Sequence, residues 1–318
     1  MSTATVIDGR RYAADLSTLL ADEVEDLATT GVRPGLATVL VGTSYPALAY
    51  ERRVRRLADK VGCHYVCEAL PGDAVEADAL AIVGKLGADP RISGILILRP
   101  LPAQVSEASL YRALDPVKDI ESVHPISAGL LALGRPRYVP STPASVFHLL
   151  DRYLSESGRD PARTYAQSNL VVVGRSANVG KPALMLAMER GATVVSCDEH
   201  SHAAGLLFEH TARADILVVA AGVPGLIRAE HVKEGVIAVD VGINAIRDAL
   251  TGEVRLVGDI DTDDVAPCAE AITPVPGGVG PITDVWLLRN TVSAARLAQG
   301  IGASLAGTEG LRLHSVGA

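Results

Sequence analysis

Aromatic side chains are scarce in this chain of 318 residues, where Phe, Trp and Tyr together make up 3% of the composition. Hydrophobic residues still account for 48%, so the core must be built mainly from aliphatic side chains. Strands rich in Val, Ile and Leu and buried on both faces are typical of parallel sheets covered by helices. The composition therefore favours an α/β fold, and the length suggests about two domains.

The sequence also lacks the features of an exported or membrane-spanning protein. Its first residues contain no basic stretch followed by an apolar segment, as a secretory signal would. The longest apolar run, 216–227, is too short to span a bilayer and contains Gly and Pro. The cysteines form no C-x-x-C pair and fit no metal-binding pattern; they are Cys63, Cys67, Cys197 and Cys268. We therefore expect a cytoplasmic protein with reduced thiols, no metal site and no membrane partner.

An excess of basic residues is absent as well. The chain has 29 Lys and Arg against 37 Asp and Glu, which gives a formal net charge of −8. This balance argues against a nucleic acid or an anionic membrane surface as the partner. It leaves room for a small anionic ligand, which needs only a local site.

Two series of alternating strands and helices run along the chain, as in parallel sheets with crossover helices. The first series predicts helices at 9–29, 46–61 and 75–86 and strands at 36–41, 65–70 and 92–98. A stretch rich in Pro and Gly with short helical pieces, 100–141, leads to a predicted helix at 142–153. The second series predicts strands at 170–173, 193–196, 216–220 and 236–241 and helices at 179–190, 203–212 and 281–305.

The segment LVVVGRSANVGKP, 170–182, predicts a strand, a tight turn and a helix. Gly174 ends the strand, Ser176 lies in the turn and Gly180 falls in the first helical turns. The free N–H groups at a helix start suit a pyrophosphate. However, the spacing G-x-S-x-x-x-G differs from the usual G-x-G-x-x-G, and strand–glycine–helix turns also occur without a ligand. A phosphate site is thus one of two readings from the motif alone.

An acidic residue follows the next predicted strand, where this fold places a partner for the ribose hydroxyls. This residue is Asp198, and Glu199 comes next. A carboxylate here repels a 2′-phosphate by about 4 kcal/mol at ~4 Å and an effective dielectric near 20. Arg175 acts in the opposite direction, since a guanidinium pairs with phosphate. The pattern predicts NAD, with NADP as the alternative, and a solvated loop at 198–199 is the reading without a ligand.

Several blocks resemble the methylenetetrahydrofolate dehydrogenase/cyclohydrolase family, and together they cover residues from about 5 to 300. In the C-terminal half they are VVVGRSANVGKP (171–182), ADILVVAAGVPGLI (214–227), VIAVDVGIN (236–244), LVGDID (256–261) and ITPVPGGVGPIT (272–283). In the N-terminal half they are VGTSYPALAY (41–50), GILILRPLP (94–102), PVKDIESVH (116–124) and VPSTPAS (139–145).

The resemblance implies an N-terminal three-layer α/β domain for folate, 1–144, completed by the helix 283–305. It implies a Rossmann domain for the dinucleotide, 145–282, with the folate cleft between the two domains. Residues 306–318 are expected to form a flexible tail. The implied reaction is oxidation of 5,10-methylenetetrahydrofolate with hydride transfer to NAD or NADP, and many members hydrolyse the product further. The family also implies a homodimer.

The resemblance also implies roles for particular residues. Those expected at the reacting folate are Tyr50, which stacks on its ring, Leu98 and Glu121, which bonds the donor edge of the pterin. Further substrate contacts are implied for Val54, Pro276, Gly277, Gly278 and Thr283. Cofactor contacts are implied for Gly174, Arg175, Ser176, Asp198, Ile243 and Asn244. For Leu98 core packing is an equal alternative, Thr283 is equally able to cap the last helix, and His124 is expected to be structural.

The sequence departs from the family at five positions around the folate. The lysine of the family's Tyr-x-x-x-Lys motif is Val54, and the family's glutamine is Leu98. The aspartate and glycine of its K-D-V-D-G block are Glu121 and Ser122, and the cysteine of its P-C-T-P block is Ser141.

These departures bear differently on the two reactions of the family. Hydride transfer needs orientation and no general base. Hydrolysis of the methenyl product needs a side chain that titrates near neutrality. A buried lysine can meet this need because burial lowers its pKa, whereas Val54 cannot. We therefore predict a dehydrogenase whose cyclohydrolase activity is lost or weak, similar to the monofunctional NAD-linked branch of the family.

Three alternatives stay open at this point. A bifunctional enzyme could activate water by another route. A repurposed paralogue could bind folate or nucleotide without turnover. A specialised enzyme could act on a different one-carbon adduct.

Overall fold

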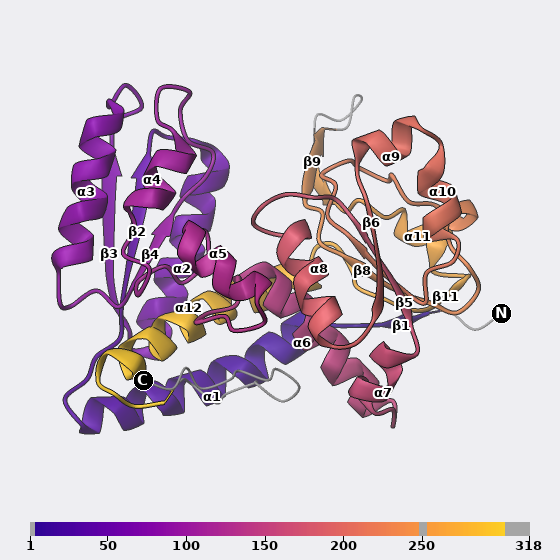
Figure 1. The fold of residues 1–318 in the computed structure, drawn as a ribbon, viewed down its shortest axis with the longest axis horizontal. Coiled ribbons are helices and arrows are strands. Elements are labelled where there is room, and N and C mark those ends of the chain that lie inside the picture. Colours follow the sequence, from indigo (N-terminus) through magenta and orange to yellow (C-terminus); the bar gives the residue numbers. More distant parts are fainter. Residues whose placement is uncertain (1–3, 248–252, 303–318) are drawn as a thin grey trace. The chain divides into compact units, whose positions relative to one another are not determined.

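The computed structural model describes residues 4–247 and 253–302. The chain divides into two compact units, each built from separate stretches of sequence. Unit 1 comprises residues 1–13 and 142–283, and unit 2 comprises residues 14–141 and 284–318. The unit boundaries fall within three helices, α1 (Gly9–Thr29), α6 (Ser141–Glu156) and α12 (Val279–Ala298), which are labelled in Figure 1.

Unit 2 contains a three-stranded parallel sheet in the order β3-β2-β4. Buried Ala37, Val39 and Ile95 on one face pack with the buried side of α3. On the other face, Thr38 and Tyr65 bond to each other, and Tyr65 also donates to Glu51 of α2. Helices therefore cover both faces. The elements are β2 (Gly35–Val41), α2 (Tyr45–Val61), β3 (His64–Leu70), α3 (Glu76–Ala88), β4 (Gly94–Ile97), α4 (Glu107–Ala113) and α5 (Pro125–Ala132).

Unit 1 contains a six-stranded parallel sheet in the order β6-β5-β7-β8-β11-β1. Apart from the exposed Asn169 at the start of β5 and the buried Asp240 at the end of β8, its central strands consist of buried aliphatic residues, as expected for a sheet covered on both faces. Its strands are β1 (Thr5–Val6), β5 (Asn169–Val173), β6 (Thr193–Cys197), β7 (Ile216–Val219), β8 (Val236–Asp240) and β11 (Ala269–Ile272). Its further elements are α6 (Ser141–Glu156), α7 (Pro161–Ala166), α8 (Gly180–Glu189), α9 (Glu199–Ala203), α10 (Leu206–Thr211), η1 (Ala229–His231), α11 (Thr262–Val265) and the hairpin of β9 (Asn244–Arg247) and β10 (Val254–Val257).

The predicted α/β class and the two series of strands and helices are confirmed. Two predicted helices were wrong in detail. The helix expected at 203–212 is two helices, α9 and α10, because Gly205 between them adopts a left-handed conformation with φ of 72°. The closing helix ends at Ala298, earlier than the predicted residue 305. The predicted tail 306–318 lies outside the described residues, as do residues 303–305.

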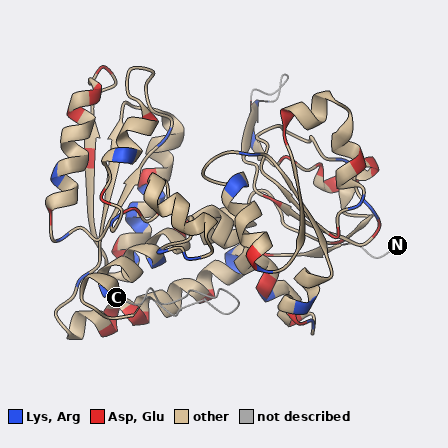
Figure 2. Ribbon diagram, viewed as in Figure 1, with Lys and Arg blue, Asp and Glu red and all other residues tan. Residues whose placement is uncertain are grey.

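Acidic and basic residues are spread along the helices of each unit (Figure 2). Within the described part of the chain, no helix is both long enough and apolar enough to cross a bilayer.

Candidate functional site

A cavity of about 470 Å³ lies at the carboxyl ends of β5, β6 and β7 in unit 1. The chain order of the sheet reverses here, because β6 lies on one side of β5 and β7 on the other. Ligands of open α/β sheets bind at such a switch point. The lining includes Gly174, Arg175, Ser176 and Asp198, so the structure brings four predicted cofactor residues to one cavity.

The turn after β5 requires glycine for steric reasons. Gly174 has a φ of 110°, and a Cβ there would lie 2.1 Å from the carbonyl oxygen of Ala220 at the end of β7. A Cβ on Gly180 would lie 2.0 Å from the carbonyl oxygen of Gly174. Because both glycines lack a side chain, the turn packs closely on the neighbouring strand and on the start of α8, and this leaves its outer side open to the cavity.

Arg175 and Asp198, which were expected to favour different cofactors, pair with each other. The Nη1 of Arg175 lies 2.6 Å from Oδ2 of Asp198, and the same guanidinium donates to the hydroxyl and the carbonyl of Ser196. The other oxygen of Asp198 accepts from the backbone and the hydroxyl of Ser201, so Asp198 caps α9. These hydrogen bonds and the nearby guanidinium lower the pKa of Asp198. The carboxylate is therefore ionised and fixed in place beside the cavity.

The glycine-rich loop before α12 lies against the start of α1. A Cβ on Gly278 would meet the carbonyl oxygen of Pro274 and the side chain of Thr273, each at 2.8 Å, and a Cβ on Gly277 would meet the guanidinium of Arg10 at 2.9 Å. Pro276 is exposed. The predicted loop thus presents one exposed proline beside two buried glycines.

Ile243 and Asn244 follow β8 in unit 1. Ile243 is exposed, and its Cδ1 lies 3.7 Å from where a Cβ on Gly280 would be, which places it near the glycine-rich loop. The amide of Asn244 donates to Oδ1 of Asp259 at 2.8 Å. The other oxygen of Asp259 accepts from the backbone N–H groups of Ala221 and Gly222. Asp259 therefore connects the predicted nicotinamide segment to the loop after β7.

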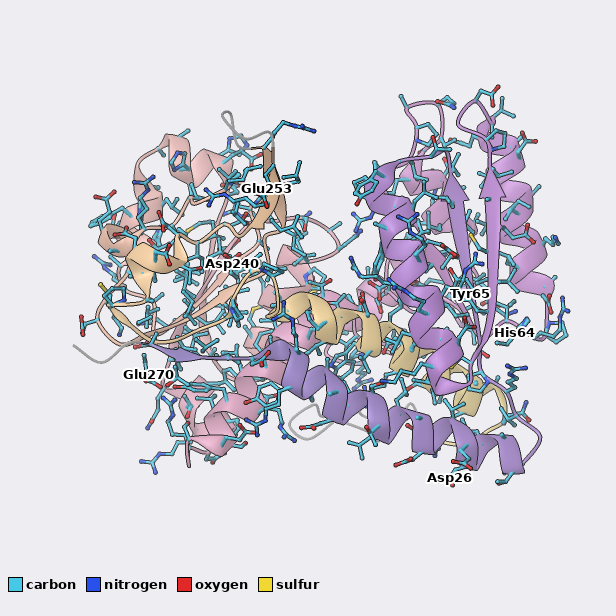
Figure 3. The ribbon with its side chains drawn as sticks, turned by 180° about the vertical axis from the view of Figure 1, so that it is seen from behind. Asp26, His64, Tyr65, Asp240, Glu253 and Glu270 are labelled. Atoms are coloured by element: carbon cyan, nitrogen blue, oxygen red, sulfur yellow. The ribbon has the colours of Figure 1, made fainter. Side chains whose placement is uncertain are left out.

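Sequence reasoning missed Asp259 and its neighbour Asp240. The Asp240 carboxyl is buried and accepts three backbone N–H groups, from Gly242, Asp259 and Ile260 (Figure 3). Burial raises its pKa to about 7, and the nearby Asp259 carboxylate adds to this effect. The signal was present in the DVGIN and GDID blocks, since Asp240 lies two residues before a glycine and Asp259 directly follows one.

Thr283 does not cap the last helix. Since α12 begins at Val279, Thr283 lies in its second turn, where its hydroxyl donates to the carbonyl of Val279. The capping alternative was therefore wrong, and contact with folate stays a prediction. His124 has the expected structural role, because its Nδ1 accepts from the N–H of Ile126 at the start of α5.

The predicted folate residues of unit 2 lie on α2, at the end of β4 and in the segment before α5. The Tyr50 phenol has a pKa raised well above its usual value by burial and by the nearby carboxylates of Asp284 and Glu121. Arg53 and Arg99 oppose this shift. The guanidinium of Arg53 lies over the Tyr50 ring, 5.2 Å from its centroid, and pairs with Asp284 at 3.1 Å. The charge of Glu121 thus acts on the Tyr50 phenol. Arg53 and Asp284 also belong to this group of interacting residues, and the sequence did not indicate either of them.

Glu121 forms hydrogen bonds with Ser141, another position at which the sequence departs from the family. Its two oxygens accept from the backbone and the hydroxyl of Ser141, at 3.1 and 3.0 Å. Burial raises the pKa of Glu121 to about 7, while the Ser141 hydrogen bonds act in the opposite direction. Ser122, the third departure in this region, has a φ of 53° and donates its hydroxyl to the carbonyl of Tyr138. The carboxyl at 121 and the hydroxyl at 141 therefore form one hydrogen-bonded unit.

Val54 and Leu98 are both packed in the interior of unit 2. Their exposed fractions are 0% and 1%. The structure thus places an aliphatic group where the family motif has an amine. The role of both residues in lining a folate pocket stays a prediction.

Two family models match the chain. The model for the catalytic domain of tetrahydrofolate dehydrogenase/cyclohydrolase matches residues 7–121. The model for the NAD(P)-binding domain of the same family matches residues 140–299.

Whole proteins of known name are similar over nearly the full length. A protein of Rubrobacter xylanophilus named bifunctional protein FolD 3 is 65% identical over 294 residues, which cover 92% of each chain. The methylenetetrahydrofolate dehydrogenase-cyclohydrolase of Trypanosoma brucei, solved with NADP cofactor and inhibitor, is 31% identical with a TM-score of 0.86, over 94% of this chain and 99% of the other. A methylenetetrahydrofolate dehydrogenase from the silkworm Bombyx mori is 32% identical with a TM-score of 0.83, over 93% and 99%.

Proposed function

Because the chain belongs to the tetrahydrofolate dehydrogenase/cyclohydrolase family, we propose that it oxidises 5,10-methylenetetrahydrofolate to 5,10-methenyltetrahydrofolate. The hydride passes to a nicotinamide dinucleotide, which supplies the redox chemistry. The cavity at the switch point of unit 1 supports this assignment, because a tight glycine turn and a fixed carboxylate suit the phosphates and a ribose of such a cofactor.

The proposed cofactor is NAD in preference to NADP. The Asp198 carboxylate can accept a hydrogen bond from a ribose hydroxyl, since its present partners use three of its about four acceptor positions. A 2′-phosphate at the same place would meet this carboxylate, and the only nearby guanidinium that lines the described cavity, Arg175, is already paired with it. The charge of Arg175 is thus largely offset before a phosphate arrives.

On the folate side, we propose that Tyr50 packs on the ring of the substrate and that Glu121 accepts hydrogen bonds from its pterin donors. A carboxylate has about four acceptor positions, and Glu121 uses two of them with Ser141. Leu98, Val54, Thr283 and the loop 276–278 complete the proposed substrate contacts. The Ser141 bonds hold the carboxylate of Glu121 in one orientation, which offsets the freedom of its additional methylene.

We propose further that hydrolysis of the methenyl product is lost or weak. The observation that carries this proposal is Val54, a fully buried aliphatic residue on α2 at the lysine position of the family motif. No proton can be taken up or released at this position, so water activation needs another group.

A second candidate function is a bifunctional enzyme in which Glu121 activates water. The favouring observation is that its pKa is raised to about 7, the range in which a carboxyl group works well as a general base. The relative from Rubrobacter xylanophilus is also named bifunctional.

One spectrophotometric experiment tests these functions. Methylenetetrahydrofolate is supplied with NAD or NADP, and the absorbance of the methenyl product is followed after turnover. We expect a higher kcat/KM with NAD, and methenyl decay no faster than without enzyme. A higher kcat/KM with NADP contradicts the cofactor proposal, and no turnover with either favours the paralogue without activity.

Two variants separate the hydrolysis hypotheses. Val54→Lys is expected to accelerate methenyl decay, whereas Val54→Met, similar in length but without an amine, is not. If the unmodified enzyme accelerates decay and Glu121→Gln abolishes this at saturating substrate while dehydrogenase kcat persists, the second candidate function is correct. Circular dichroism checks that each variant is folded.

A further inference from the structure

A second cavity, of about 620 Å³, lies within unit 2 at the amino ends of its three strands. Its lining includes Arg33, just before β2, His64, the first residue of β3, and Ser93, just before β4. Leu98 follows the carboxyl end of β4, so the cavity and the proposed folate residues are at opposite ends of this strand, roughly 16 Å apart at 3.3 Å per residue. The cavity is therefore separate from the proposed folate site.

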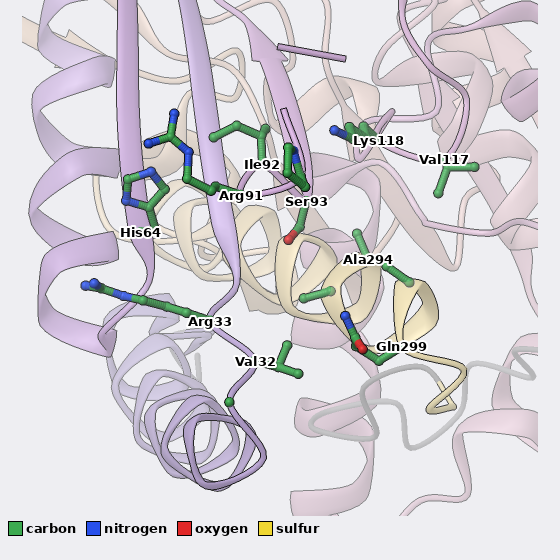
Figure 4. Close-up of a pocket in the computed structure, with 14 residues that line it drawn as sticks. Val32, Arg33, His64, Arg91, Ile92, Ser93, Val117, Lys118, Ala294 and Gln299 are labelled. Atoms are coloured by element: carbon green, nitrogen blue, oxygen red, sulfur yellow. The ribbon is translucent and has the colours of Figure 1, made fainter. Parts of the chain in front are cut away.

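Basic side chains line this cavity, and no acidic residue does. One of them, Arg91, is paired at 2.7 Å with Asp89, which lies outside the lining and offsets part of the positive charge. The basic residues are Arg33, His64, Arg91 and Lys118. Figure 4 shows the first three on one side of the cavity and Lys118 on the other, and Figure 3 shows His64 at the end of its strand. This one-sided lining contrasts with the net charge of −8 of the chain, so it is a local feature with a local potential.

These basic groups keep unused hydrogen-bond donors. Arg33 donates from Nε to the carbonyl of Gly62, which leaves its remaining N–H groups available. Lys118 donates to the carbonyls of Leu86 and Asp89 and has a third N–H. The Nε2 atom of His64 is buried and finds no hydrogen-bond partner among the described residues. This atom has almost no accessible surface, so a ligand in the cavity reaches it only if the His64 ring turns.

Most of the remaining lining is apolar, with Ser93 and Gln299 as its polar members. It includes Val32, Ile92, Val117 and the alanines of the last turns of α12, among them Ala294 and Ala298. The volume falls within the range of pockets for small organic ligands. We propose that this cavity binds a small organic anion, with a phosphate or carboxylate at the basic groups and an apolar body against Val32, Ile92 and α12.

The same cavity is connected to Glu121 through a short segment. Val117 and Lys118 line it, and the next residues run beside β4, where the N–H of Ile95 donates to the carbonyl of Lys118. The amide of Asn290 on α12 donates to the carbonyl of Ile120, directly before Glu121. A ligand that displaces the backbone at 117–118 would act on the same segment that positions Glu121. On the proposed function, which this step presupposes, occupancy of the cavity changes the KM for folate.

Calorimetry with phenyl phosphate tests whether the cavity binds such an anion. Inorganic phosphate, which has only the anionic group, and phenol, which has only the ring, are measured for comparison. We expect phenyl phosphate to bind, phenol not to bind, and affinity to fall with added salt. Arg33→Gln should weaken binding about tenfold, as the loss of a charge-assisted hydrogen bond does. Arg112→Gln, an exposed arginine of α4 outside the cavity, should leave it unchanged.

Absence of binding, or equal binding by the unmodified protein and Arg33→Gln, overturns the site. Arg33 is exposed, so its replacement should leave the fold intact, and the melting temperature checks this. Saturating phenyl phosphate should shift the KM for methylenetetrahydrofolate in the unmodified enzyme and not in Arg33→Gln, and an unchanged KM overturns the connection to Glu121. If the protein binds phenyl phosphate but has no dehydrogenase activity, the cavity stands and the proposed function fails.

Discussion

Two buried carboxyl groups have similar pKa values but different surroundings. The pKa of Asp240 and that of Glu121 are each raised to about 7, in both cases mainly by burial. Asp240 is surrounded by three backbone donors within loops of unit 1, which suits a structural role. Glu121 accepts two hydrogen bonds, from the backbone N–H and the hydroxyl of Ser141. Of the two, Glu121 has more acceptor capacity for a ligand, and its protonation state therefore bears on substrate affinity.

The raised pKa of Glu121 predicts a pH-dependent stability. In the unfolded chain this carboxyl loses its proton near its ordinary pKa of 4.5, whereas in the folded chain it keeps the proton up to about pH 7. The contribution of Glu121 to the free energy of unfolding is therefore fully present below pH 4.5 and is lost as the pH rises through 7. The loss is on the order of 1–3 kcal/mol.

Glu121→Gln removes this dependence and leaves Asp240 unchanged. Between pH 4.5 and 7.5, the free energy of unfolding of Glu121→Gln should rise relative to that of the unmodified protein by about the same 1–3 kcal/mol. Urea denaturation at several pH values measures the difference. A difference that is constant with pH would mean that Glu121 titrates at its ordinary value.

The ion pair of Arg175 and Asp198 predicts a shift in cofactor selectivity. Asp198→Ala releases the guanidinium of Arg175 and removes the carboxylate beside the ribose. The ratio of kcat/KM for NADP to that for NAD should rise, by about tenfold or more, since an electrostatic change of about 1.4 kcal/mol corresponds to tenfold. Steady-state kinetics with both cofactors measures this. Arg213→Ala, which breaks an exposed arginine–glutamate pair of unit 1 outside the cavity, is the control and should leave the ratio unchanged.

At the scale of residues, the sequence predicted which positions belong to the site better than it predicted which side chains bond to each other. Arg175 and Asp198 could be named from the motif and its spacing, but not their mutual pairing, which depends on side-chain conformation. Ser141 was known only as a departure from the family, and its bond to Glu121 joins positions 20 residues apart. Asp284 was missed because a charge at the start of the buried part of α12 has no pattern of its own.

At the scale of elements, the turn between β5 and α8 depends on Gly174. Gly174→Ala should lower the free energy of unfolding by about 2–4 kcal/mol, because it combines a left-handed φ with a clash against the Ala220 carbonyl. Gly222→Ala is the matched control, since its φ is 69° and a Cβ there meets nothing within 4 Å. It should cost about 1–2 kcal/mol. Urea denaturation of both variants measures the difference, and equal losses would show that packing at Gly174 does not matter.

Long periodic elements were predictable and short strands were not. The helix α1 was predicted with its observed ends, because apolar positions recur at helical spacing and Gly31 and Pro34 follow it. The strands β1 and β11 and the hairpin of β9 and β10 were missed. These strands have two to four residues each, so pairing with distant partners, and not local sequence, decides their structure.

At the scale of the whole molecule, the homodimer stays a prediction from the family resemblance. The chain has a mass of 33.1 kDa, so light scattering coupled to gel filtration should give twice this value. The charge of −8 limits non-specific association, which makes a stable doubled mass a sign of a specific interface. A single-chain mass at micromolar concentration would contradict the expectation.

The edge strand β1 affects how the chain folds during synthesis and which fragments of it can be expressed alone. Thr5 and Val6 pair with Ala271 and Ile272 of β11, so the first strand to leave the ribosome finds its neighbour only when synthesis is nearly finished. Until then the N-terminal segment must stay soluble without a partner. A fragment limited to 145–282 would expose β11 as an open sheet edge, which invites pairing between copies. A separately expressed nucleotide domain should therefore aggregate unless the first thirteen residues are fused back to it.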